Sequence, residues 1–101
     1  MLILPIKKKW YNMIVSGEKK EEYRSLTRYY YSRFKKYEIG SNKPFEILLR
    51  NGYSSTSPTV KCVVTVRTGV GKEKWGAVPN EAYFVLEIKE VKKYEVCKES
   101  R

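Results

Sequence analysis

The chain has 101 residues, enough for one domain, and 42% of them are hydrophobic while 32% are charged. This composition excludes a disordered chain and supplies enough apolar side chains for a core without metal or disulfide support. The formal net charge is +10, from 21 basic and 11 acidic residues, and it favours a polyanionic partner, nucleic acid before an anionic membrane surface. Because many basic proteins bind no nucleic acid, the charge alone does not decide the function.

The residue types exclude several kinds of site. The sequence contains no histidine, which removes the commonest general base and metal ligand and excludes Ser-His-Asp and Cys-His catalysis. Cys62 and Cys97 are too few and too far apart for a zinc site, so we expect neither a metal nor a cofactor. Cys62 should lie in the core of a cytoplasmic protein with reduced thiols. No apolar run approaches the roughly 18 residues that a membrane helix needs.

The first predicted elements are a short strand over residues 2–6 and a helix over residues 7–16. Pro5 shortens that strand or places it at a sheet edge. The helix carries an apolar stripe at helical spacing, which indicates packing against a core: Trp10, Met13 and Ile14. Gly17 is suited to end the helix, and the chain after it should run extended.

A second helix is predicted over residues 26–37, with Ser25 or Thr27 as its N-cap. One face is aromatic and should pack on the sheet: Tyr30, Phe34 and Tyr37. Another face carries Arg28, Tyr31 and Lys35. This second face is either simply solvated or lies along a phosphate backbone, with the tyrosine available to stack or to hydrogen-bond.

Three further strands are predicted over residues 45–50, 59–67 and 82–91. Asn51-Gly52 is a strong turn signal, and residues 68–79 read as a long glycine-containing loop. The tail after Val91 should add a short strand and then fray. The pattern predicts one α+β domain, a small mixed β-barrel of four to six mostly antiparallel strands with two short helices.

Residues 17–24 hold the densest polar signal, with the pattern G-x-K-x-x-E-x-R. Because alternate side chains of an extended segment point the same way, Glu22 and Arg24 should share a face, with Lys19 close by at the turn. The cluster is either an ordinary surface group of ion pairs or a site for a planar polar ligand, such as a base or a phosphate. We expect Lys19 and Arg24 to be exposed at a cleft rim, where alanine would leave the fold intact.

This octet resembles the signature of the ASCH domain, a branch of the PUA-like superfamily. Other segments resemble the same family: Leu2-Ile3-Leu4-Pro5-Ile6, residues 45–53, Gly69-Val70-Gly71, Trp75-Gly76-Ala77 and residues 83–88. Together they look like the small ASCH proteins of phages and prophages. The resemblance implies a single ASCH domain over residues 1–101, a PUA-like barrel, and a ligand cleft at Gly17, Lys19, Glu22 and Arg24.

Two further segments are candidates for the walls of that cleft. The first is the turn after the strand at residues 45–50, with Arg50, Asn51 and Tyr53. It is either an ordinary hairpin turn or a second wall, where Asn51 would bond a base edge and Tyr53 would stack. In the glycine loop, Lys72 and Lys74 suit a mobile, phosphate-facing lid, although the spacing is not that of a P-loop. Trp75 is either a core plug or a base-stacking platform.

Three functions remain open. The first is binding of RNA, a nucleotide or a nucleoside in a basic cleft around the octet. The second is a small hydrolase acting on RNA or on a modified nucleoside, because some ASCH proteins resemble 4-acetylcytidine amidohydrolases. In that reading Lys19 is an activated amine or electrostatic anchor and Glu22, which stands where that group has threonine, shuttles protons. A binder should then tolerate Glu22→Gln and a hydrolase should not. The third is a phage-encoded adaptor that binds a host protein through the tyrosine helix.

Overall fold

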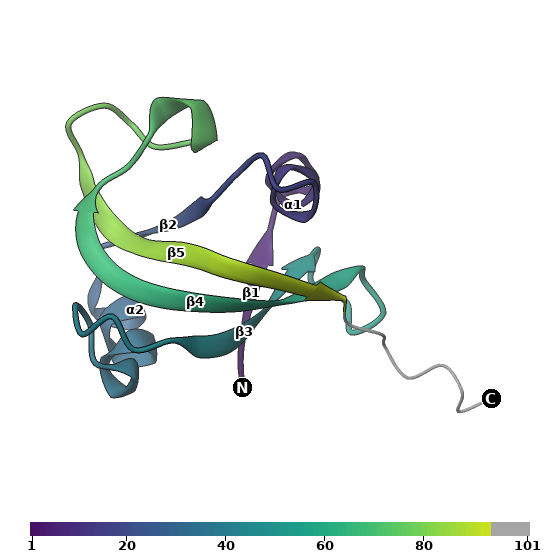
Figure 1. The fold of residues 1–101 in the computed structure, drawn as a ribbon, viewed down its shortest axis with the longest axis horizontal. Helices are drawn as coiled ribbons and strands as arrows, with labels where there is room; N and C mark the ends of the chain where they lie inside the picture. The colour runs from purple at the N-terminus through teal and green to yellow at the C-terminus, as the bar shows by residue number, and fades with distance from the viewer. Residues whose placement is uncertain (94–101) are drawn as a thin grey trace.

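A single five-stranded sheet, curled into a half-barrel, organises residues 1–93, the part of the chain that the structure, a computed structural model, describes (Figure 1). The strands are β1 (Leu2–Ile6), β2 (Glu21–Ser25), β3 (Phe45–Asn51), β4 (Thr59–Val70) and β5 (Ala82–Lys93). Their order is β1-β3-β4-β5-β2, with β1 parallel to β3 and the other pairs antiparallel. The predicted α+β class with a small, mostly antiparallel mixed barrel is confirmed.

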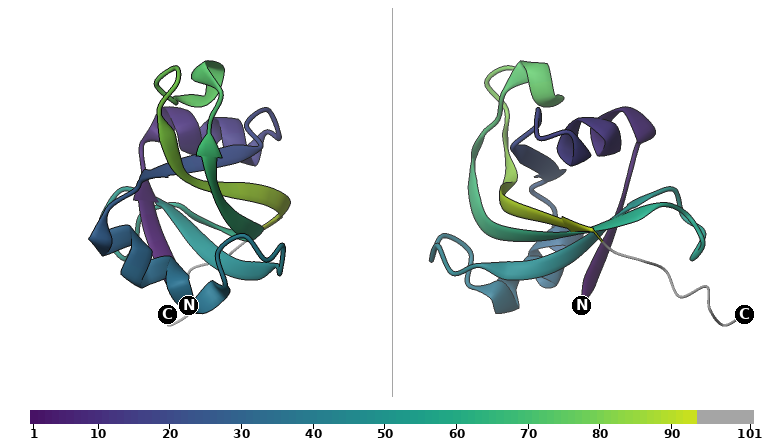
Figure 2. Two further views of the ribbon diagram at one scale, coloured as in Figure 1. Left: turned by 90° about the vertical axis from the view of Figure 1, so that its left-hand side faces the viewer. Right: turned by 45° about the vertical axis from the view of Figure 1, so that its right-hand side comes forward.

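Short helical segments occupy the connections of this sheet: α1 (Lys8–Val15), α2 (Arg28–Phe34), η1 (Lys35–Tyr37) and η2 (Glu73–Trp75). Gly17 ends the first helical region as predicted, with a φ of 88° and its N–H bonded to the Ile14 carbonyl. Thr27, and not Ser25, caps α2, because its hydroxyl accepts from the Tyr30 N–H at 3.2 Å. The two views of Figure 2 place α1 and α2 at opposite ends of the half-barrel.

The core lies on the concave side of the sheet and receives one fully buried side chain from each helix. Ile14 of α1 and Phe34 of α2 are both 0% exposed, and the Phe34 ring meets Phe84 of β5 edge to face at 5.3 Å. The predicted apolar stripe of α1 is only partly right, because Trp10 and Met13 are half-buried. This leaves the Trp10 ring available near the surface.

Cys62 lies fully buried on β4, as predicted. Burial raises the pKa of its thiol to about 12, so the native state keeps this thiol protonated at neutral pH. Cys97 and the tail beyond residue 93, for which a short strand was predicted, lie outside the described residues.

Strands β4 and β5 are longer than the sequence pattern predicted. Gly69 and Val70 pair with Tyr83 and Ala82, so the first part of the predicted loop continues the antiparallel ladder. The connection between the strands therefore spans only residues 71–81 and contains η2. A glycine-rich segment looks like a loop in isolation, but here the partner strand holds it extended.

The two outer strands, β1 and β2, face each other across the open seam of the half-barrel. They are not paired with each other. A side chain crosses between them instead, since the Arg24 Nη2 of β2 donates to the Pro5 carbonyl of β1 at 2.8 Å. Pro5 thus lies on an edge strand, as predicted, and its strand edge is capped by a charged group.

The β4–β5 connection is fixed to the sheet rather than free. Tyr23 of β2 accepts from the Lys72 N–H at 2.9 Å, and its ring covers Gly71. A Cβ on Gly71 would lie 2.5 Å from the Tyr23 ring and 2.8 Å from the Ala77 Cβ. The segment predicted to be a mobile lid is therefore tied to the body of the domain by these contacts and by the Lys19 bond described below.

We expect Gly71→Ala to lower the free energy of unfolding by about 1–3 kcal/mol, the usual cost of overpacking. The control is Gly69→Ala, where the new methyl group would meet only the flexible end of Arg67 and the loss should be smaller. Urea unfolding of both variants measures the difference. Equal stability of the two would show that the Tyr23 contact does not fix the connection.

Candidate functional site

Three side chains of the octet form one ionic cluster between β2 and the rest of the fold. The Glu22 carboxylate lies between two cations: its Oε1 is 3.2 Å from Lys19 Nζ and its Oε2 is 2.8 Å from Arg24 Nη2. The shared face predicted for Glu22 and Arg24 follows from the extended conformation of β2. The cluster carries a formal net charge of +1.

The expectation that Lys19 is exposed at a rim is wrong, because its side chain is 1% exposed. Its ammonium group lies above the rings of Trp10 and Tyr23, at 5.2 and 4.8 Å from their centroids. It donates to the Glu21 carbonyl and to the Trp75 carbonyl, the latter at 2.8 Å. With Glu22 as the third acceptor, every N–H of the ammonium has a partner, and the lysine fastens β2 to the β4–β5 connection.

Arg24 is also more buried than expected, with 11% of its side chain exposed. Its guanidinium donates to Glu22, to the Pro5 carbonyl and to the Tyr30 hydroxyl, at 2.8, 2.8 and 3.3 Å. The pKa of Arg24 is raised, because the attraction of Glu22 and the bond to Tyr30 outweigh the opposing effect of burial. Arg24 therefore joins β1, β2 and α2 while staying charged.

Burial lowers the pKa of Lys19 below that of a free lysine, and the Glu22 carboxylate opposes this effect. The unfolded lysine keeps its proton to higher pH than the native one. The ionisation of Lys19 therefore makes the free energy of unfolding increase with pH, from the lowered native pKa up to the pKa of the unfolded lysine. When it is protonated, the Lys19 ammonium has three acceptors around it, an arrangement that suits a structural cation.

A cleft of about 510 Å³ runs along the seam beside this cluster. It is lined by Pro5, Ile6, Lys7, Lys8, Trp10, Glu22, Tyr23, Arg24, Asn51, Gly52 and Tyr53. Four residues predicted from the sequence come together here from two different segments: Glu22, Arg24, Asn51 and Tyr53. The turn after β3 is thus a wall of the same cleft as the octet, and the Tyr53 side chain stands 88% exposed at it.

Other predicted residues lie elsewhere. Gly17 and Lys19 line a second pocket of about 250 Å³ between the end of α1 and β5. Arg50 does not line the cleft, and its buried Nε has no hydrogen-bond partner among the described residues. Trp75 is 7% exposed, which favours the plug over the stacking platform.

The remaining predicted cations are exposed and fall at the two ends of the molecule. Arg28 lies on α2 and Lys35 on η1, both outside the lining of the cleft. Lys72 and Lys74 flank the Trp75 ring, with their ammonium groups 5.7 and 5.0 Å from its centroid. The first pair belongs to the end of the fold that is opposite α1, as Figure 2 shows.

Four charged or aromatic residues of the cleft were not predicted from the sequence: Lys7, Lys8, Trp10 and Tyr23. Trp10 fitted an apolar helical stripe, and this concealed its second role. Lys7, Lys8 and Trp10 reach the cleft through the parallel pairing of β1 with β3, which sets Ile6 opposite Asn51. That pairing brings the start of α1 to the turn after β3, and it is not encoded in any local spacing.

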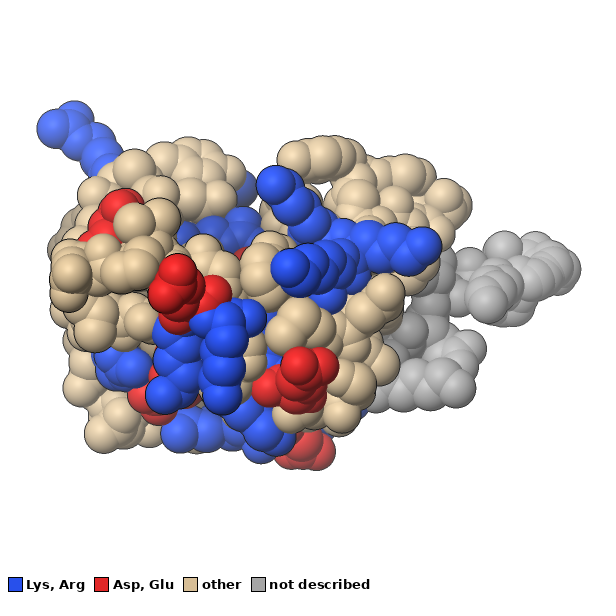
Figure 3. Space-filling model, turned by 90° about the horizontal axis from the view of Figure 1, so that it is seen from above, with Lys and Arg blue, Asp and Glu red and all other residues tan. Residues whose placement is uncertain are grey.

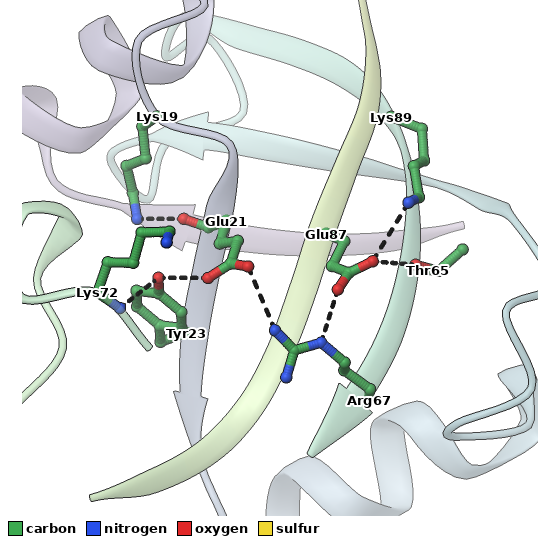
Figure 4. Close-up of polar contacts among 8 residues, drawn as sticks. All are labelled: Lys19, Glu21, Tyr23, Thr65, Arg67, Lys72, Glu87 and Lys89. Atoms are coloured by element: carbon green, nitrogen blue, oxygen red, sulfur yellow. Dashed lines mark hydrogen bonds and ion pairs between the residues drawn. The ribbon is translucent and has the colours of Figure 1, made fainter. Parts of the chain in front are cut away.

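A second polar network covers the outer face of the sheet beside Tyr23 (Figure 4). Arg67 of β4 bridges two carboxylates, Glu87 at 2.6 Å and Glu21 at 3.3 Å. Glu21 also accepts from the Tyr23 hydroxyl at 2.6 Å, and this bond together with burial raises the pKa of Tyr23. The network therefore holds the Tyr23 ring in place between the cleft and the β4–β5 connection.

No family model, curated protein or solved structure matches this chain. Within residues 1–93 no group of three or more histidine, cysteine, aspartate or glutamate side chains is placed to hold a metal ion. No helix of this part of the chain is long and apolar enough to cross a membrane. The assignment of a function therefore depends on the cleft and its charges.

We expect Glu22→Gln to lower the free energy of unfolding by about 3–5 kcal/mol, because it leaves two buried cations without a counter-charge. This replaces the expectation that a binding protein would tolerate the change. The control is Glu38→Gln, which breaks an exposed pair with Lys43 and should alter stability little. Thermal and urea unfolding of both variants provide the measurement, and similar stabilities would contradict the structural role of Glu22.

Proposed function

We propose that the chain is a non-catalytic, ASCH-like module that binds RNA or a nucleotide, with a nucleobase held in the seam cleft. The observation that carries this proposal is the make-up of the cleft, in which cations, aromatic rings and an amide line one cavity. Lys7, Lys8 and Arg24 supply positive charge, and Asn51 offers both a donor and an acceptor. The cavity of about 510 Å³ falls in the size range of small-ligand sites.

The aromatic residues of the cleft fit a flat ligand. Trp10, Tyr23 and Tyr53 all line it, from three separate segments. Stacking of a base on such a ring contributes about 1–3 kcal/mol and depends little on sequence. The Lys9 ammonium above the Trp10 ring, 4.6 Å from its centroid, adds positive charge at the same place.

The octet supports the proposal in a different way from the one expected. Instead of offering free charges to the ligand, Lys19 and Glu22 fix the strand that bears the cleft wall. Arg24 lines the cleft and is bonded to β1, so its side chain is already fixed before a ligand binds. Binding a ligand would therefore cost little side-chain entropy at this residue. The arrangement favours a preformed binding site, which agrees with a binding module.

We expect Tyr53→Ala to weaken binding of nucleoside 5′-monophosphates or of a short RNA by roughly 5- to 150-fold, the loss of one stacking contact. The fold should persist, because this side chain is 88% exposed. Tyr31→Ala is the matched control, since it removes the same ring from an exposed position on α2. Fluorescence titration or calorimetry measures both.

Two outcomes would contradict the proposed function. One is that neither monophosphates nor short RNA bind to the parent protein at low salt. The other is that Tyr53→Ala and Tyr31→Ala change affinity equally, because the cleft would then have no particular role. Turnover of a nucleoside by the parent protein would instead favour the hydrolase alternative.

A further inference from the structure

A surface of unpaired lysines extends from the cleft to the β4–β5 connection. We define this lysine platform as Lys7, Lys8, Lys9, Lys72 and Lys74, all exposed. None of them forms an ion pair with any residue of the described chain, whereas Lys43, Lys89 and Lys92 do. Figure 3 views this end of the molecule and shows basic side chains grouped across it.

Trp10 connects the two halves of the platform. Trp10 lines the cleft, and its ring also lies against Gly76 of the β4–β5 connection, where an added Cβ would be 3.0 Å from the ring. The lysines at the start of α1 and those around η2 are therefore neighbours across one tryptophan. The cleft opens directly onto this charged surface.

The position of the second pair of lysines is fixed by the contacts of their loop. Lys72 has its backbone N–H bonded to Tyr23, and the Trp75 carbonyl accepts from the buried Lys19. The loop also carries two exposed carboxylates, Glu73 and Glu81. Charges presented on a preformed surface bind a ligand with less loss of entropy than charges on a mobile loop.

We propose that the ligand of the cleft is a single-stranded nucleic acid segment of several nucleotides, with the phosphates that follow the bound base lying on the lysine platform. This inference rests on the proposed function, because it assumes that a base occupies the cleft. A free nucleotide would fill the cleft and leave Lys72 and Lys74 without a partner. The phosphates of a longer strand that leaves the cleft past Trp10 would instead contact Lys72 and Lys74.

The sequence had suggested the basic face of α2 as the contact for phosphates, and the structure favours the platform. Arg28 and Lys35 lie at the other end of the half-barrel from α1 and do not line the cleft (Figure 2). On a neighbouring face of α2, Arg33 donates to the Tyr29 hydroxyl at 2.8 Å, so that cation is already engaged within the helix. A short strand anchored in the cleft reaches the platform first.

The test compares two double variants with the same change in charge. Lys72→Gln with Lys74→Gln alters the platform, and Lys35→Gln with Lys36→Gln alters the α2 end. The probes are a labelled six-nucleotide RNA of mixed sequence and the nucleoside 5′-monophosphates, titrated between about 50 and 500 mM salt, a range over which phosphate contacts change affinity strongly.

For the six-nucleotide RNA we expect the platform variant to reduce the slope of log K against log salt by about 1.4, or 0.7 for each lost contact with a single strand. If the variant and the parent protein converge near 1 M salt, this corresponds to on the order of 50-fold weaker binding at 50 mM. The α2 variant should keep the parent slope. Monophosphates should bind the platform variant as they bind the parent.

Three results would overturn the inference: equal slopes in both double variants, a platform variant that binds RNA as the parent does, or RNA that binds no tighter than a monophosphate. Competition by a polyglutamate peptide as effective as by RNA would also overturn it, because the platform would then accept any polyanion. Failure of the proposed function gives a different pattern, in which Tyr53→Ala changes the binding of neither probe.

Discussion

The Glu22 carboxylate between Lys19 and Arg24 is the interaction on which the rest of the site depends. Each of its oxygens is paired with one cation, and each cation then bonds to backbone carbonyls of other segments. Through Lys19 the carboxylate holds the β4–β5 connection, and through Arg24 it holds β1. A buried ionic group of this kind adds little net stability compared with apolar packing, but removing one member leaves uncompensated charge. Its main effect is to fix where neighbouring segments lie.

This arrangement explains how a half-barrel with two unpaired edge strands keeps an open cleft without losing its shape. A backbone ladder between β1 and β2 would close the seam and leave no cavity. A single guanidinium bridge from Arg24 to the Pro5 carbonyl holds the strands together at one point. The space beside that bridge is the cleft, and its walls come from β1, α1, β2 and the turn after β3. The bond between Arg24 and the Pro5 carbonyl thus stabilises the seam, and it also leaves open the cavity that would receive a ligand.

Positive charge is distributed unevenly over this frame. Carboxylates of the sheet are engaged by Arg67, Lys89 and Lys92, so the strands are close to neutral on their outer face. The five lysines of the lysine platform form no ion pair among residues 1–93. Their electrostatic field adds to that of the Lys19–Glu22–Arg24 cluster beneath them. Because unscreened surface charge attracts polyanions over several ångströms, this end of the molecule is where an anionic ligand would first be held.

The sequence by itself determined the local features of this protein: the helix ended by Gly17, the extended octet that places Glu22 beside Arg24, the burial of Cys62 and the α+β class. These follow from side-chain periodicity and turn chemistry, which act over a few residues. Only the tertiary structure decided that the octet is buried, that Trp10 lines a cleft and that the β4–β5 connection is tied down. Each of those depends on parallel pairing of β1 with β3 or on bonds between residues more than 50 positions apart, such as Lys19 and Trp75. Charged side chains are usually exposed. No local pattern shows when carbonyl groups from distant segments will compensate the loss of hydration that a buried charge suffers.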